Sequence, residues 1–111
     1  MDTVNENSTR DVEITFINHA GEPVTPDKGS YKITDVESST VIVEETDFTP
    51  TTNTHTITIE ADENTILNAD SEYEERVLTI KWFYNSMARE ENEEYRYRVK
   101  NLIGVDKDEF S

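Results

Sequence analysis

The chain has 111 residues, enough for one domain with a modest core and too few for two ordinary domains. With 25 acidic and 10 basic residues its net charge is -15, a sign that disfavours contact with nucleic-acid phosphates and anionic lipid. Cysteine is absent, which excludes disulfides and thiolate metal sites. No apolar run is long enough to span a membrane and residues 1–8 lack signal-peptide features, so we expect a soluble protein.

The first part of the chain predicts a leader followed by a strand. Residues 1–10 are polar and small, which is typical of a disordered leader. Residues 11–18 alternate, with Val12, Ile14 and Phe16 on one face, as a half-buried strand does. Turn residues follow. Val24 stands between two prolines and predicts a short edge segment, because proline cannot donate to a β-ladder.

The middle of the chain predicts three strands. Residues 31–35 and 40–44 are expected to form a hairpin with a loop of about five residues. Residues 45–53 read as a surface loop in which Phe48 tucks under the core. Residues 55–60 alternate again and predict a third strand.

Residues 61–74 are the most ambiguous segment of the sequence. Asp62 is placed to cap a single helical turn, because a carboxylate accepts backbone N–H groups at a helix start. Ile66 and Leu67 are then expected to close one end of the core.

Residues 75–85 are the longest strand-like run and hold the only tryptophan. Most of them are β-branched or aromatic, which favours a pleated, half-buried surface. A buried helix is the alternative, but its apolar residues would surround the axis without forming a stripe. Because side chains of a strand alternate between its two faces, the core face is expected to carry Leu78, Ile80, Trp82 and Tyr84. The segment is therefore predicted to be an interior strand, with a mixed second face.

The last part of the chain predicts a loop, a strand and a tail. Residues 85–94 are charged and lack an apolar stripe, so we expect a long exposed loop. Residues 95–102 alternate between an apolar face and a basic face. The basic face carries Arg96, Arg98 and Lys100, expected to pair across strands with acids such as Glu13 or Glu75. Residues 104–111 form an acidic tail.

Together these segments predict an all-β protein, an antiparallel β-sandwich of immunoglobulin-like type with about six to seven strands. The sandwich is expected to span residues 11–103 as a single domain, between the leader at 1–10 and the tail at 104–111. A small open or closed barrel is the alternative. The Cys-Trp-Cys pattern of true immunoglobulin domains is missing, so the prediction concerns architecture and not family.

No stretch of the sequence spells out a reaction. His19 falls in a predicted turn and His55 begins a strand, and nothing frames either as a catalytic base. Acidic clusters could hold calcium, but none has the spacing of a known calcium loop. The clusters are Asp62, Glu63 and Asn64, then Asp70, Glu72 and Glu74, then Asp106, Asp108 and Glu109. We therefore predict no catalytic residue, no cofactor and no metal site.

Aromatic side chains on the surface would indicate sugar binding by stacking. Most of the aromatic residues are assigned to the core, since a small sandwich needs its large side chains inside. Phe83 and Tyr73 are the two that the pattern leaves pointing outward.

The strand and turn segments resemble small β-sandwich proteins of tailed bacteriophages and prophages, which are encoded among head and tail genes. The segments that carry the resemblance are residues 12–16, 21–26, 31–35, 56–59, 75–80 and 95–102. They are strand and turn signatures without a chemical motif. The resemblance implies a virion-associated or assembly protein without catalysis, and no functional residue carries over from it.

These observations give a first hypothesis: a non-enzymatic structural or protein-interaction module, a component of a phage or prophage virion. Its partners are then virion proteins or further copies of itself, without nucleic acid or membrane. It would be found in virions, or in the host cytoplasm during assembly. The loops at 45–53 and 85–94 are the expected contact regions. The alternatives are a carbohydrate-binding module and an acidic inhibitor that imitates nucleic acid for a DNA-binding protein.

Overall fold

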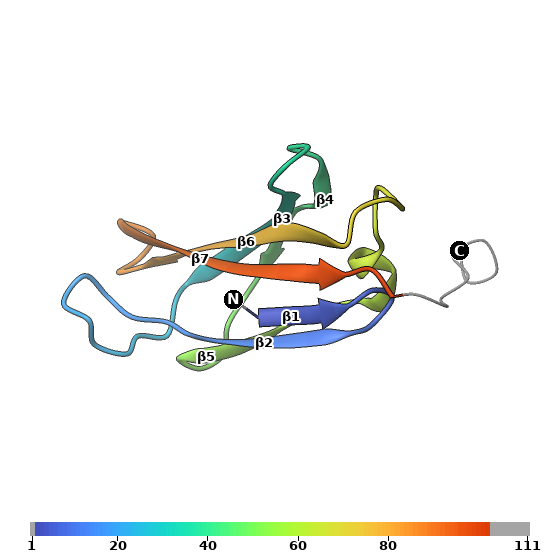
Figure 1. Ribbon diagram of the computed structural model, residues 1–111. Helices are drawn as coiled ribbons and strands as arrows, with labels where there is room; N and C mark the ends of the chain where they lie inside the picture. The colour runs from blue at the N-terminus through green and yellow to red at the C-terminus, as the bar shows by residue number, and fades with distance from the viewer. Residues whose placement is uncertain (1, 103–111) are drawn as a thin grey trace.

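The computed structural model describes residues 2–102, which form two packed β-sheets (Figure 1). A five-stranded sheet has the order β1-β7-β6-β3-β4, and a two-stranded sheet contains β2 and β5. The strands are β1 (Asp2–Asn5), β2 (Arg10–Thr15), β3 (Lys28–Asp35), β4 (Val41–Phe48), β5 (Thr54–Ile59), β6 (Tyr73–Tyr84) and β7 (Arg89–Lys100). Every pairing between them is antiparallel except that of β1 with β7. The predicted antiparallel β-sandwich is thus confirmed.

The core lies between the two sheets and is built from alternate residues of the strands. Its buried apolar members are Val4, Val12, Ile14, Phe16, Ile33, Ile57, Ile59, Leu78, Ile80, Trp82, Tyr84, Tyr97 and Val99. Both sheets contribute, so each strand stabilises the fold by removing one face from water.

β6 is the interior strand that the sequence predicted, because it pairs with β3 on one side and with β7 on the other. Its residues alternate strictly between buried and half-buried positions along its whole length. Trp82 is 1% exposed, meets the Phe16 ring edge-on at 5.2 Å between centroids and donates its indole N–H to the Ile17 carbonyl at 2.9 Å. Satisfying the indole N–H is what allows tryptophan to be buried this deeply.

The predicted disordered leader is wrong for the residues that the structure describes. Asp2–Asn5 is a strand that pairs in parallel with Tyr97–Lys100 of β7. The strand is short and buries a single apolar side chain, Val4, which is 4% exposed. One buried residue gives no alternation to detect in a sequence. Residues 2–5 are therefore part of the sandwich, whereas the sequence placed its first strand at residue 11.

The predicted loop at 85–94 is also wrong. β7 begins at Arg89, and the turn from β6 takes only residues 85–88. Asn85, Ser86 and Met87 all have positive φ, and an aspartate carboxylate, that of Asp27, accepts the Met87 N–H at 3.1 Å. The start of β7 extends beyond the sandwich, where both of its faces meet water (Figure 1). It therefore lacks the alternating pattern by which a strand is recognised.

The remaining boundaries differ in smaller ways. β4 continues to Phe48, whose ring packs against the core at the end of that strand. Val24 forms no strand, although its N–H donates to the Phe16 carbonyl at 3.0 Å beside an isolated bridge. A 3-10 turn occupies Ala61–Asn64, but it starts after Glu60, so Asp62 lies inside the turn and does not cap it.

Two further predictions concern the ends of the core and of the chain. Ile66 packs against the core, whereas Leu67 is 48% exposed and does not close it. The predicted acidic tail at 104–111 lies outside the described residues. Within residues 2–102 the 3-10 turn is the sole helical segment, and it is too short to cross a lipid bilayer.

Candidate functional site

A cleft of about 530 Å³ lies where the edges of the two sheets meet. β1 covers the outer edge of β7 only from Tyr97 to Lys100. The rest of that edge, residues 89–96, has no neighbouring strand within the described chain. β2 pairs only with β5, so its other edge borders the same cleft. β1 lies between β2 and β7 (Figure 1). The cleft opens beyond the start of β1, where no strand of residues 2–102 pairs with the edge of β7.

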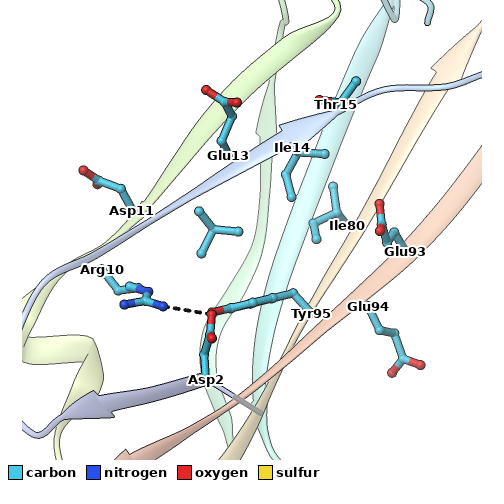
Figure 2. A pocket seen from close by; sticks show the side chains of 11 residues that line it. Asp2, Arg10, Asp11, Glu13, Ile14, Thr15, Ile80, Glu93, Glu94 and Tyr95 are labelled. Carbon is cyan, nitrogen blue, oxygen red and sulfur yellow. Dashed lines mark hydrogen bonds and ion pairs between the residues drawn. The ribbon is translucent and has the colours of Figure 1, made fainter.

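The floor of the cleft is apolar and its rim is acidic (Figure 2). Val12, Ile14 and Ile80 form the floor, at the margin of the core. The acidic side chains on the rim are Asp11, Glu13, Glu93 and Glu94. The alternation of strand residues explains this division on β2, because odd positions point to solvent and even positions point to the core.

Glu93 is an acid on the core-facing side of β7. It lies opposite Ile80 in the register with β6, in phase with the aromatic residues Tyr95 and Tyr97. A charge in that phase is tolerated because the side chain faces the open cleft and is exposed. Inward-pointing charges at a sheet edge oppose uncontrolled strand pairing.

One end of the cleft is closed by three hydrogen-bonded side chains. Arg10 Nη2 donates to Asp2 Oδ2 at 2.8 Å, and the Tyr95 hydroxyl donates to the same oxygen (Figure 2). The bonds from Tyr95 and Arg10 lower the pKa of the Asp2 carboxyl. Burial and the bond to Asp2 raise the pKa of the Tyr95 hydroxyl. At neutral pH the carboxylate is therefore charged and the phenol protonated, so this cluster is a fixed contact between β1, β2 and β7.

Along the open edge, no strand of residues 2–102 pairs with the backbone of β7. The Lys100 carbonyl accepts the Glu6 N–H at 2.9 Å, so the backbone N–H and C=O groups of Lys100 point away from β6 and toward β1. Successive strand residues point their backbone groups to alternate sides. Glu90, Asn92 and Glu94 are in phase with Lys100, so their N–H and C=O groups face outward beyond the reach of β1.

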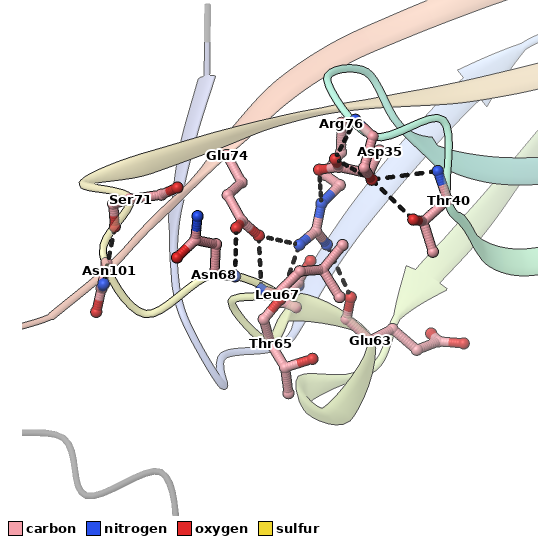
Figure 3. A network of polar contacts seen from close by, with 12 residues as sticks. Asp35, Thr40, Glu63, Thr65, Leu67, Asn68, Ser71, Glu74, Arg76 and Asn101 are labelled. Atoms are coloured by element: carbon pink, nitrogen blue, oxygen red, sulfur yellow. Dashed lines mark hydrogen bonds and ion pairs between the residues drawn. The ribbon is translucent and has the colours of Figure 1, made fainter.

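A different polar network occupies the end of the sandwich near the 3-10 turn (Figure 3). Its centre is Arg76, which is fully buried. The guanidinium donates to Asp35 Oδ1 at 2.9 Å and to Glu74 Oε1 at 2.8 Å. It also donates to the carbonyls of Glu63 at 3.3 Å and Thr65 at 2.8 Å. Arg76 thereby ties the turn at 61–64 and the segment after it to β6.

The two carboxylates of the network are themselves fully engaged. Glu74 accepts the backbone N–H groups of Leu67 and Asn68, each at 2.8 Å. Asp35 accepts the backbone N–H of Ser38 at 3.0 Å and its hydroxyl at 2.7 Å. Burial opposes ionisation of Asp35 most strongly, but the bonds from Ser38 and Arg76 outweigh it and lower the pKa of this carboxyl. The network is therefore a structural one, with its charges committed to holding loops.

The sequence analysis did not predict this network, although the alternation of residues along β6 places two of its members on the core face. Glu74 and Arg76 continue the core face of β6 by steps of two from Leu78. Charged residues in phase with a buried face indicate a buried ion pair, because an isolated charge there is too costly.

The two histidines are placed separately in the fold. His55 lies on β5 and stacks on the Phe48 ring, 4.3 Å between centroids and 7° from parallel. His19 is exposed in the turn after β2, where its backbone N–H donates to the Tyr84 hydroxyl at 2.9 Å. Neither is placed beside a nucleophile by the hydrogen bonds of the described chain.

The acidic clusters considered for calcium are used otherwise. Within residues 2–102 no group of three potential ligands is positioned around one point. Asn64 is buried and donates its side-chain amide to the Ser8 carbonyl at 2.7 Å. Glu74 belongs to the network around Arg76. The third cluster, Asp106, Asp108 and Glu109, lies outside the described residues.

One of the two outward aromatic residues, Tyr73, and two residues of the basic row, Arg96 and Arg98, also have partners. Tyr73 is half-buried and carries the Arg98 guanidinium over its ring at 4.2 Å, while Phe83 is half-buried on the outer face of β6. Arg96 pairs with Glu75 at 3.0 Å, as predicted. The alternative acid, Glu13, instead lines the cleft.

No known protein family, curated protein or solved structure gives a significant match to this chain.

Proposed function

We propose that the chain is a non-enzymatic protein-interaction module that binds its partner at the cleft between β2 and β7. The single observation that carries this proposal is the open edge at residues 89–96, because unpaired backbone groups next to an apolar floor are a template for another chain. The titratable groups with shifted pKa values serve hydrogen-bonded pairs that hold strands and loops together. Their committed bonds support a binding role over a catalytic one.

We further propose that this module belongs to the virion of a tailed phage or prophage, in the head or tail. The support is the resemblance of the strand and turn segments to small sandwich proteins of such particles. The strand order supports the immunoglobulin-like part of this proposal, because β7-β6-β3-β4 opposite β2-β5 can be matched to strands G-F-C-C′ opposite B-E of immunoglobulin variable domains. Immunoglobulin-like sandwiches are rigid carriers of binding edges and loops.

The test is the composition of phage particles from cells that encode the chain. Particles are induced, purified by density-gradient sedimentation and analysed by mass spectrometry. The proposal predicts that the chain sediments with the particles. Its presence in the lysate together with its absence from washed particles would contradict the virion assignment.

Carboxyl-to-lysine cross-linking of the same particles tests the location of the contact. Glu93 and Glu94 at the cleft are expected to cross-link to lysines of a virion protein. Glu44 is the control, since it is an exposed acid on β4 at the opposite edge of the five-stranded sheet. Cross-links from Glu44 without any from the two cleft acids would move the interaction site away from the cleft.

The carbohydrate-binding alternative receives no support from the described chain. Sugar stacking needs an exposed aromatic face. Within residues 2–102 every aromatic side chain is buried or half-buried, and Trp82 is 1% exposed. The imitation of nucleic acid rests on the net charge alone.

A further inference from the structure

We propose that the partner presents an extended basic segment, which adds as a strand to the open edge of β7 in line with β1. This inference rests on the proposed function and specifies the kind of partner. A strand added to a sheet edge is bound by its main chain, and its alternate side chains give specificity.

The backbone geometry gives the first argument. β1 already demonstrates strand addition to this edge, since Asp2 to Asn5 pair with Tyr97 to Lys100 and Glu6 donates to the Lys100 carbonyl. The same row of outward groups continues through Glu90, Asn92 and Glu94 without a partner strand in residues 2–102. An incoming segment of about five residues would match this stretch at the rise of an extended strand.

The cleft gives the second argument, because it receives one face of the added strand. Side chains on that face would point toward Val12, Ile14 and Ile80, which are buried apolar residues at the floor. An aliphatic residue there gains the free energy of removing apolar surface from water. The expected pattern is thus an aliphatic residue at alternate positions.

Charge gives the third argument and selects the partner. Glu93 faces the cleft, and Glu90 and Glu94 flank the open edge on the outer face of β7. The cation that lines the cleft, Arg10, is already paired with Asp2. Lysine or arginine on the outer face of the added strand would meet Glu90 and Glu94 as cross-strand neighbours, an arrangement that stabilises a sheet.

The same charges disfavour a second copy of this chain as the occupant. Pairing two copies edge to edge would set Glu90, Glu93 and Glu94 against the same acids. Like charges directly opposite each other destabilise a strand pair. The net charge of -15 adds long-range repulsion between copies.

The test uses a fluorescent peptide of sequence Ac-Lys-Ile-Lys-Val-Lys-Thr-Lys-NH2 and fluorescence anisotropy at physiological salt. Any purification tag is placed after Ser111, because a tag before Asp2 would lie at the open edge. The chain should bind this peptide. A version with glutamate in place of lysine should bind at least about tenfold more weakly, since like charges oppose pairing.

Two changes separate strand addition from charge attraction. The first is a peptide N-methylated at alternate residues, which keeps its charge and loses the donors that face β7. The second is Asn92→Pro in the protein, which removes an outward N–H that makes no bond to β6. Each should weaken binding about tenfold, the effect of losing one to two hydrogen bonds. Glu44→Gln at the opposite sheet edge should leave binding unchanged.

The outcomes decide between the proposals. Equal affinity for the N-methylated peptide would overturn strand addition and leave charge attraction as the whole effect. Absence of peptide binding would overturn it as well. A virion partner that binds the Asn92→Pro chain as tightly as the unmodified chain would overturn strand addition while the interaction role stands. The fold of the Asn92→Pro chain is checked by Trp82 fluorescence, and the N-methylated peptide tests strand addition without any protein variant.

Discussion

Two regions of the sandwich, the network around Arg76 and the cleft, each contain an arginine–aspartate pair, and the two pairs serve different purposes. Around Arg76 the arginine is fully buried and its partner Asp35 is 3% exposed, and every charge is bonded to loops. At the cleft, Arg10 and Asp2 form a similar pair, but their side chains are 37% and 50% exposed. A buried pair becomes indispensable once its members are desolvated, whereas an exposed pair contributes little. The network around Arg76 is therefore committed to stability, whereas the cleft is the region where we propose that a partner binds.

Replacing each arginine by methionine gives the largest expected contrast. Arg76→Met leaves Asp35 and Glu74 buried without their counter-charge and is expected to lower the free energy of unfolding by about 3–5 kcal/mol. Arg10→Met removes an exposed pair and should cost about 1 kcal/mol or less. Urea denaturation followed by Trp82 fluorescence measures both. Equal losses of unfolding free energy in the two variants would contradict the distinction between the structural network around Arg76 and the exposed pair at the cleft.

The two tyrosines of β7 give a smaller contrast. Tyr97 is fully buried, and its hydroxyl donates to Asn64 Oδ1 at 3.4 Å, whereas the Tyr95 hydroxyl bonds to the exposed Asp2. Tyr97→Phe leaves a buried amide oxygen without this donor and should cost about 1–2 kcal/mol. Tyr95→Phe should cost about 0.5 kcal/mol or less. Thermal unfolding of both variants tests the ranking, and a larger loss for Tyr95→Phe would reverse it.

Titration of the same tyrosines provides an independent measurement. Burial raises the pKa of the Tyr97 hydroxyl to about 12. The Tyr95 pKa is also raised, by burial and by the bond to Asp2. Tyrosine ionisation is followed by ultraviolet absorbance as the pH is raised, in the unmodified chain and in the two phenylalanine variants. The tyrosine that ionises at the highest pH should be missing from the titration of Tyr97→Phe. Its persistence in that variant would argue that Tyr97 is accessible to water.

Low pH should weaken the contribution of the network around Arg76 to the unfolding free energy, because it protonates Asp35. The folded-state pKa of Asp35 lies below its ordinary value of 3.8, because hydrogen bonds from Ser38 and Arg76 outweigh the effect of burial. The stability that this group contributes is therefore present above pH 3.8 and is lost as the pH falls through the folded-state pKa. The difference in unfolding free energy between the chain and Asp35→Asn should shrink over that window. A difference that does not change with pH would show that Asp35 ionisation is not coupled to folding.

The cleft acids should show the smallest effect on stability. The double variant Glu93→Gln and Glu94→Gln changes exposed residues, so unfolding should shift by about 0.5 kcal/mol or less. The change relieves repulsion in a chain of net charge -15, but it also removes the exposed ion pair between Glu94 and Arg96 at 3.7 Å, and these two small effects oppose each other. The basic peptide should nevertheless bind this variant about twofold to fivefold more weakly. A clear loss of stability with unchanged binding would mark these acids as structural.

The same contrast explains what the sequence could and could not predict. β6 was predictable because each of its residues alternates between a core and an outer face, from Leu78 to Tyr84. β1 was not predictable, because a strand that buries only Val4 shows no alternation of apolar and polar residues. The start of β7 was not, because both of its faces meet water.

The cleft was beyond prediction for a related reason. Its residues come from β1, β2, β6 and β7, and the parallel pairing of β1 with β7 decides where the edge is left open. Pairing between distant segments leaves no mark in the spacing of residues along the chain. The network around Arg76 did leave such a mark, because Glu74 and Arg76 lie at alternate positions from Leu78 on the core face of β6.

The most direct test of the open edge is hydrogen exchange of the β7 amides, measured by NMR on the free protein and with the basic peptide. In the free protein Asn92 and Glu94 should exchange fast, while their neighbours Glu91 and Glu93, whose N–H groups face β6, should exchange slowly. Comparing adjacent residues cancels any opening of the hairpin as a whole. The peptide should slow Asn92 and Glu94 alone. Protection of these two amides in the free protein, or fast exchange unchanged by saturating peptide, would contradict the account.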